Sequence, residues 1–176
     1  MKIDYEVLVF DSNPDNRILA AEHGCGLEIL VHDPDPEVRL AVAFQGCGLD
    51  KLINDSDPLV VEAARYMSYV TDAHNPHRWL SARLGYGLDI LVNDKDWRVR
   101  EAVAEQGYGL DILVSDEHAY VRKAVAEQNY ALDVLVHDTD WHVRKAVAEQ
   151  GYGLDILVND EDGLVRAAAA KMLRET

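Results

Sequence analysis

Apolar and polar positions recur along this chain with a period of 22 residues. The repeating unit is clearest in residues 85–106, which read GYGLDILVNDKDWRVREAVAEQ. Close copies follow at 107–128, 129–150 and 151–172, and looser copies extend upstream to the first residues. A unit of this length cannot bury its own apolar side chains, so it must stack against neighbouring copies. The pattern therefore predicts a repeat protein.

The second half of each unit predicts one helix. In residues 97–106, Val99, Ala102 and Val103 are spaced at i, i+3 and i+4 and share one helical face. A helix-capping residue precedes this segment in most copies. Its side-chain oxygen can accept a hydrogen bond from a backbone N–H that the helix leaves unpaired. The capping positions are Asn13, Asp35, Asp57, Asp96, Asp140 and Asp162, with His74 and His118 as the exceptions. Proline at the start of the first three helices and Gly or Asn after most of them also mark helix ends.

The first half of each unit predicts a much shorter helix, which we call the stub. In the fifth copy it is the segment 88–92, LDILV, which is long enough for about one and a half helical turns. Residues 3–10 alternate in polarity as a strand would, but Leu8 aligns with Leu30 of the next copy, which makes this segment the first stub. Each unit thus combines one long helix with one short α or 3₁₀ stub.

These elements predict an all-α fold: a right-handed α-solenoid of about eight 22-residue repeats in a single domain over residues 1–176. The expected repeats are approximately 1–26, 27–48, 49–70, 71–87, 88–109, 110–131, 132–153 and 154–176, of which 71–87 is shortened. Asp55 and Asp72 are 17 residues apart instead of 22, so a stub is missing there. Residues 68–84 are expected to form either a packing defect filled by aromatic side chains or a pocket at a kink.

Charge and cysteine usage narrow the choice of function. The net charge of −15 disfavours nucleic acid and anionic membranes, because both require a basic surface, and it suits a soluble monomer. No apolar run approaches the ~18 residues needed to cross a bilayer, and the first residues do not read as a signal peptide. Cys25 and Cys47 occupy the same repeat position. We expect reduced thiols in a cytoplasmic protein, with a disulfide between them as the alternative.

The recurring pattern D-x-D-x-x-V-R-x-A-V-A resembles the HEAT-like helical repeats. The short unit with one dominant helix is also similar to the leucine-rich repeat variant family, whose units pair an α-helix with a short 3₁₀ helix. The resemblance covers nearly the whole chain and implies an interaction scaffold. The units are shorter than is usual in either family. The cysteine-rich iron–sulfur segment found beside some variant repeats is absent from this sequence, so no cofactor is expected.

One aspartate and one arginine recur six residues apart in the unit. The pairs are Asp94 with Arg100, Asp116 with Arg122, Asp138 with Arg144 and Asp160 with Arg166; Arg17 and Arg39 continue the arginine row, which Val61 interrupts. The planar guanidinium suits a carboxylate, either in its own unit or in the next one. HEAT-like repeats use such ladders to fix the stacking of units. A pair present in nearly every copy therefore predicts a structural role rather than catalysis.

The face of the long helices turned away from Val99 is the predicted binding surface. At about 100° per residue, Trp97, Glu101 and Ala104 point away from Val99. The predicted partner-binding residues are Trp97, Trp141, Glu101, Lys123, Lys145, Glu105, Glu127 and Glu149. Tryptophan is favoured at protein interfaces. The alternative is that each tryptophan folds over the first turn of the next helix and is half buried.

An acidic row on the stubs and a pair of histidines are the remaining candidates. The acidic row comprises Glu28, Asp50, Asp89, Asp111, Asp133 and Asp155, and forms either a solvated ridge or a docking surface for a basic partner. His74 and His77 with Asp72 have the spacing of a metal site, which makes a ligand-binding, metal-binding or enzymatic pocket at 68–84 the alternative function. The sequence contains no G-x-S-x-G, P-loop, H-E-x-x-H or C-x-x-C motif. We therefore expect a non-enzymatic scaffold, without a cofactor, whose partner is another protein.

Overall fold

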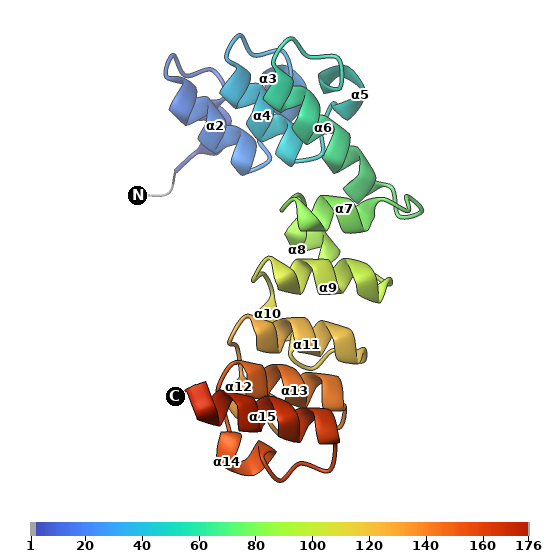
Figure 1. The fold of residues 1–176 in the computed structure, drawn as a ribbon. Coiled ribbons are helices and arrows are strands. Elements are labelled where there is room, and N and C mark those ends of the chain that lie inside the picture. The colour runs from blue at the N-terminus through green and yellow to red at the C-terminus, as the bar shows by residue number, and fades with distance from the viewer. Residues whose placement is uncertain (1–2, 176) are drawn as a thin grey trace. The chain divides into compact units, whose positions relative to one another are not determined.

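The computed structural model describes residues 3–175, and every regular element within that range is an α-helix (Figure 1). The longer helices are α2 (Pro14–Glu22), α4 (Pro36–Phe44), α6 (Pro58–Thr71), α7 (Arg78–Arg83), α9 (Trp97–Glu105), α11 (Ala119–Glu127), α13 (Trp141–Glu149) and α15 (Gly163–Glu175). The stubs are α1 (Tyr5–Leu8), α3 (Leu27–Leu30), α5 (Leu49–Leu52), α8 (Leu88–Leu91), α10 (Leu110–Leu113), α12 (Leu132–Leu135) and α14 (Leu154–Leu157). The predicted alternation of long helix and stub is confirmed, and the strand-like first segment is helical.

Residues 1–81 and 82–176 form two compact units, which we call unit 1 and unit 2. In unit 1, α2, α4 and α6 pack on one another in sequence order, and α1, α3 and α5 each pack on the long helix that follows. In unit 2, α9, α11, α13 and α15 lie side by side in the same way (Figure 1), again with each stub on the following helix. Neighbouring repeats therefore bury each other's apolar faces, as a helical repeat requires. The right-handed course, the repeat count and the single domain stay predictions.

The core consists of leucines from the stubs and of valines and alanines from the long helices. Leu113, Val121 and Val125 of two successive elements are at most 1% exposed. The sequence predicts that Ala104 points away from the core, but this prediction is wrong: Ala104 is fully buried, as is its equivalent Ala126. Because α11 and α13 pack on a long helix at each flank and on stubs as well, the buried arc of a helix is wider than the single face that the apolar spacing indicates.

The turn before each stub uses a left-handed backbone conformation. Gly109 has a φ of 60°, and a Cβ atom added there would lie 2.5 Å from Cγ2 of Val92 at the end of the preceding stub. Glycine is therefore required both by the backbone and by the close approach of the neighbouring repeat. Ala131 occupies the equivalent position before α12. It adopts a φ of 49°, which is strained for a residue with a side chain.

The irregular repeat has a longer helix in place of the missing stub. Ser68 and Val70 stand where other repeats have the two glycines of the G-Y-G turn, so the chain continues as α6 through Thr71. Met67 and Val70 in this extension are 2% and 3% exposed. Tyr66 and Tyr69 meet edge to face, with ring centroids 5.9 Å apart. The additional helical residues thus contribute to the core of unit 1.

Candidate protein-interaction surface

Arginine side chains join successive repeats to one another through the aspartate that recurs in each unit. In unit 2, Arg100 donates from Nε and Nη2 to the two carboxylate oxygens of Asp116 at 2.6 and 2.9 Å, and from Nη1 to the backbone oxygen of Asp94 at 2.7 Å. The same two-pronged contact joins Arg17 to Asp33, Arg39 to Asp55, Arg122 to Asp138 and Arg144 to Asp160. Each arginine therefore bonds to its own repeat through the backbone and to the next repeat through a carboxylate. We call this arrangement the Arg–Asp ladder.

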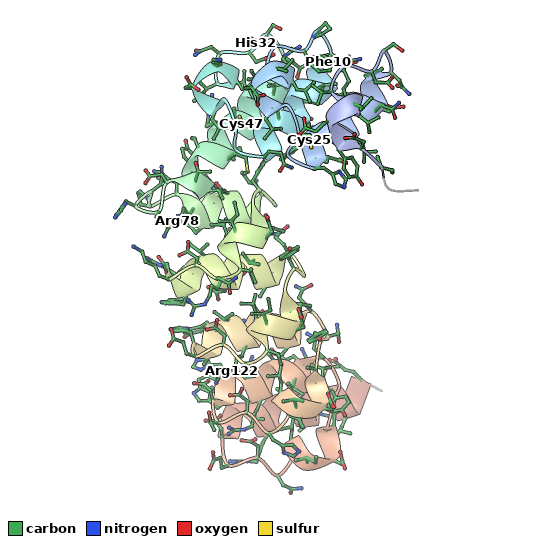
Figure 2. The ribbon with its side chains drawn as sticks, turned by 180° about the vertical axis from the view of Figure 1, so that it is seen from behind. Phe10, Cys25, His32, Cys47, Arg78 and Arg122 are labelled. Atoms are coloured by element: carbon green, nitrogen blue, oxygen red, sulfur yellow. The ribbon has the colours of Figure 1, made fainter. Side chains whose placement is uncertain are left out.

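Four aspartates of the ladder, Asp33, Asp55, Asp116 and Asp160, have a pKa below the usual carboxyl range. Burial by itself raises the pKa of Asp33 and Asp116, but hydrogen bonds from an arginine and from a backbone N–H two residues ahead lower the pKa below its usual range. For Asp55 and Asp160 the arginine hydrogen bond is the largest influence, and their pKa is also lowered. Because the carboxylates serve both the arginine and the following helix start, the ladder suits the stacking of repeats. Arg122 of the ladder is labelled in Figure 2.

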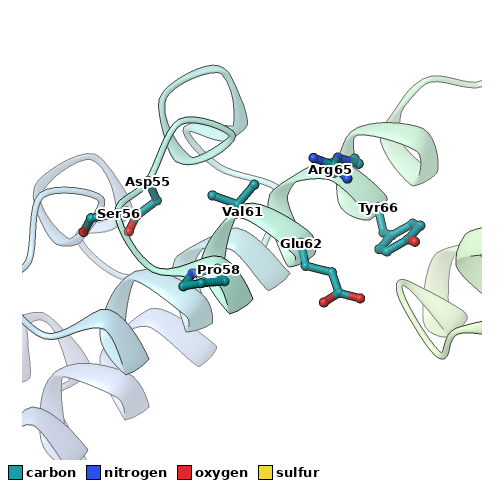
Figure 3. Close-up of a pocket in the computed structure, with 7 residues that line it drawn as sticks. All are labelled: Asp55, Ser56, Pro58, Val61, Glu62, Arg65 and Tyr66. Carbon is teal, nitrogen blue, oxygen red and sulfur yellow. The ribbon is translucent and has the colours of Figure 1, made fainter.

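The interruption of the ladder at Val61 lies beside a hollow on unit 1. The hollow has a volume of about 420 Å³, is open to solvent, and is lined by Asp55, Ser56, Pro58, Val61, Glu62, Arg65 and Tyr66 (Figure 3). Most of these residues lie along one side of α6, where Val61 takes the place of an arginine. The hollow therefore lies within residues 55–66, upstream of the 68–84 segment where the sequence predicts a pocket.

The histidines of the irregular repeat have separate surroundings. Nδ1 of His74 lies 4.0 Å from Oδ1 of Asp72, and the His74 side chain is 91% exposed. The His77 ring lies 5.7 Å from the ring of Tyr69. Within residues 3–175, no three His, Cys, Asp or Glu side chains are placed to share one metal ion. Cys25 and Cys47 of unit 1 (Figure 2) are both free thiols.

Five aromatic rings form a continuous row across three repeats of unit 2. Trp97 stacks on His118 at a centroid distance of 4.1 Å, and His118 lies 5.7 Å from Tyr120. Tyr120 lies 5.2 Å from His142, which stacks on Trp141 at 3.6 Å. We call these five residues the aromatic row. Every member is at the cap or in the first two positions of α9, α11 or α13. The rings meet because equivalent positions of stacked helices are neighbours in space.

The aromatic row is only partly buried. Tyr120 is 40% exposed, and the two tryptophans are half-buried. Trp97 lies over the cap of the next helix, which is one of the two arrangements that the sequence leaves open, whereas Trp141 stacks on a residue of its own helix. The helical periodicity predicts a role for the two tryptophans but not for the two histidines or Tyr120. The 22-residue spacing from position 120 to 142 is the signal that links them.

The charged residues predicted on the same face form pairs along α11 and α13. Lys123 bonds to Glu127 and Lys145 bonds to Glu149, each at 2.6 Å and one helical turn apart. In α9 the lysine position is occupied by Glu101. Burial and the nearby Glu105 raise the pKa of Glu101, and Lys123 partly offsets this shift. The predicted charged row therefore carries both signs.

An aliphatic row on the stubs was not predicted from the sequence. This row lies next to the predicted acidic row and consists of four side chains that are each about half exposed: Ile90, Ile112, Val134 and Ile156. A single helical turn can direct only some side chains of an L-D-I-L-V segment toward the core. The number of apolar residues in the stub therefore indicates that at least one of them is exposed.

Comparison with known proteins adds no relative: no family model matches the chain, and no curated protein matches it. Within residues 3–175, no helix combines the length and the apolar character that crossing a membrane requires. The surface itself therefore carries the functional argument.

Proposed function

We propose that this protein is a non-enzymatic scaffold that binds another protein through the aromatic row and the charged positions beside it. The contact surface comprises Trp97, Trp141, Glu101, Lys123, Lys145, Glu105, Glu127 and Glu149, extended by His118, Tyr120 and His142. One observation carries the proposal: five rings remain in contact across three repeats while staying partly exposed. Tryptophan and tyrosine are the residue types that most often dominate binding energy at protein interfaces.

The arrangement suits an elongated partner. Equivalent side chains recur at each repeat, so a partner segment that follows the stack meets the same chemistry at regular intervals. The Lys–Glu pairs on α11 and α13 offer charge-assisted contacts at the rim of the aromatic row. Rim charges influence association rate and specificity more than affinity. In this proposal the scaffold is a right-handed solenoid and acts as a monomer in the cytoplasm.

The substitution His118→Asp tests the proposal without weakening the fold. Asp96 and Asp140 at the equivalent positions accept a hydrogen bond from the N–H two residues ahead at 3.0 and 2.9 Å. His118 makes no such cap. Aspartate should therefore add a cap to α11, worth about 0.5–2 kcal/mol, while removing the central ring of the row.

The measurement compares proteins captured from the native host by the wild-type chain and by His118→Asp, followed by calorimetric titration of the partner found. Tyr152→Ala is the matched control, because Tyr152 is 42% exposed in the same unit but is not in the aromatic row. We expect His118→Asp and the pair Trp97→Ala, Trp141→Ala to lose the partner and Tyr152→Ala to keep it. Retention of the partner by all variants would remove this surface from consideration.

A ligand or metal site at the irregular repeat is the second candidate, and the hollow beside Val61 is the observation that favours it. In this alternative, Asp72, His74 and His77 lie downstream of the hollow and contribute to a neighbouring binding site. Val61→Trp would fill the hollow. If the hollow binds a small molecule, Val61→Trp abolishes the thermal stabilisation that the molecule gives the wild type.

A further inference from the structure

The four stubs of unit 2 each present an aliphatic side chain beside a carboxylate at the surface. The aliphatic residues Ile90, Ile112, Val134 and Ile156 are 51%, 52%, 61% and 48% exposed. The carboxylates Asp89, Asp111, Asp133 and Asp155 directly precede them and are exposed as well. We call these eight residues the aliphatic–acidic strip. The strip belongs to α8, α10, α12 and α14, and the aromatic row belongs to the long helices.

Two of the turns between these stubs are closely packed on the preceding stub segment. Val92 at the end of α8 approaches the Gly109 turn that begins α10, and Val136 approaches Gly153 in the same way before α14. Leu91 faces inward and is 1% exposed, so the adjacent Ile90 is turned away from the core by about 100°. The long helices on which these stubs pack lie side by side in sequence order. Packed helices are about 8–10 Å apart, so four successive stubs span roughly 24–30 Å.

The charge of this strip indicates what kind of partner can bind to it. The four stubs read LDIL, LDIL, LDVL and LDIL, and every charged residue in them is acidic. A second copy of the chain would bring carboxylates against carboxylates, and an anionic membrane would be repelled. A row of half-exposed aliphatic side chains is typical of an interaction site. We propose that the strip binds a segment of another protein that carries aliphatic side chains together with lysine or arginine.

Unit 1 provides an internal contrast. In α5 the position equivalent to Ile112 is Lys51, whose Nζ lies 3.4 Å from Nε2 of His32. The same stub framework therefore accepts a lysine at this position, which would repel a basic segment. Ile112→Lys is accordingly a substitution that the fold tolerates and that should block the strip of unit 2.

The test uses a fluorescently labelled synthetic amphipathic helix built from leucine and lysine, titrated with the full chain and followed by anisotropy. We expect saturable binding that weakens as salt rises, because the carboxylates attract the lysines. Ile112→Ser should weaken binding about fivefold, the loss expected for a half-buried aliphatic contact, and Ile112→Lys should weaken it further. Thermal unfolding of each variant verifies that the fold is intact.

Matched charge variants separate a specific strip from general attraction to an acidic protein. Replacing Asp89, Asp111, Asp133 and Asp155 by Asn should abolish most of the binding. Replacing the exposed Glu22, Glu37, Glu117 and Glu161 by Gln changes the net charge equally, outside both proposed surfaces, and should leave binding nearly unchanged. Equal losses in both variants, or no saturable binding by the wild type, would overturn the inference. So would a wild-type dimer in sedimentation velocity that Ile112→Lys dissociates.

His118→Asp should leave binding of this peptide unchanged, because the substitution alters the long-helix surface. The result for the strip is therefore independent of whether the aromatic row binds a partner.

Discussion

Arg100 and Asp116 belong to successive repeats and are joined by two parallel hydrogen bonds, Nε to Oδ2 at 2.6 Å and Nη2 to Oδ1 at 2.9 Å. The third arm of Arg100 holds the backbone oxygen of Asp94 in its own repeat at 2.7 Å. Asp116 also accepts the backbone N–H of His118 at 2.8 Å. One ion pair thus links the start of one long helix to the start of the next.

This relationship predicts that the protein loses stability in acid. The pKa of Asp33, Asp55, Asp116 and Asp160 is lower in the folded chain than the ordinary carboxyl value of about 3.9. Their contribution is therefore fully present above the unfolded pKa and is lost as the pH falls through the folded values. Urea unfolding measured from pH 7 downward should show the free energy of unfolding decreasing below about pH 4. A flat profile over that range would contradict this role for the ladder.

Arg122→Lys should destabilise the protein by about 1–3 kcal/mol, because lysine cannot form the two parallel bonds to Asp138. Arg166 is the matched control, since the bonds found for it go to the backbone oxygens of Asp160 and Glu161. Arg166→Lys should cost less. Urea denaturation of both variants measures the difference, and equal costs would show that the carboxylate contact adds little.

Ala131→Gly should raise the free energy of unfolding by about 0.5–1 kcal/mol, because it relieves a left-handed backbone at φ 49°. The reverse change in another repeat, Gly109→Ala, should lower it, since the new Cβ would lie 2.5 Å from Val92. The two variants together test whether a side chain at this left-handed position lowers the free energy of unfolding, since one removes a Cβ atom and the other adds one. Thermal and urea unfolding should show both shifts.

Cys25 should react slowly with thiol reagents near neutral pH. Partial burial and the carboxylate of Glu6 raise the pKa of the Cys25 thiol, which lowers the fraction of reactive thiolate. Glu6→Gln should therefore accelerate the modification of Cys25. Cys47, in the equivalent position of the next repeat, serves as the internal reference and should keep its rate.

The local sequence is sufficient to predict the helical unit of this protein. Caps such as Asp140, terminating glycines and the apolar spacing of each helix act within a few residues, and repetition of the unit confirms every local signal several times. The recurrence of arginine and aspartate likewise predicts a structural ladder. The candidate site was predictable only in part. Periodicity defines the directions of Trp97 and Trp141 about their own helices, and so selects these two residues.

Tertiary packing decided which groups meet. It pairs Arg100 with the carboxylate of the following repeat, buries Ala104 between neighbouring elements, and brings His118 and His142 into the aromatic row. It also leaves Ile112 at the surface beside Asp111. The physical reason is that periodicity determines the direction of a side chain about its own helix axis. The neighbour that occupies that direction depends on how close adjacent repeats approach, which is decided by the small side chains and glycine turns between them.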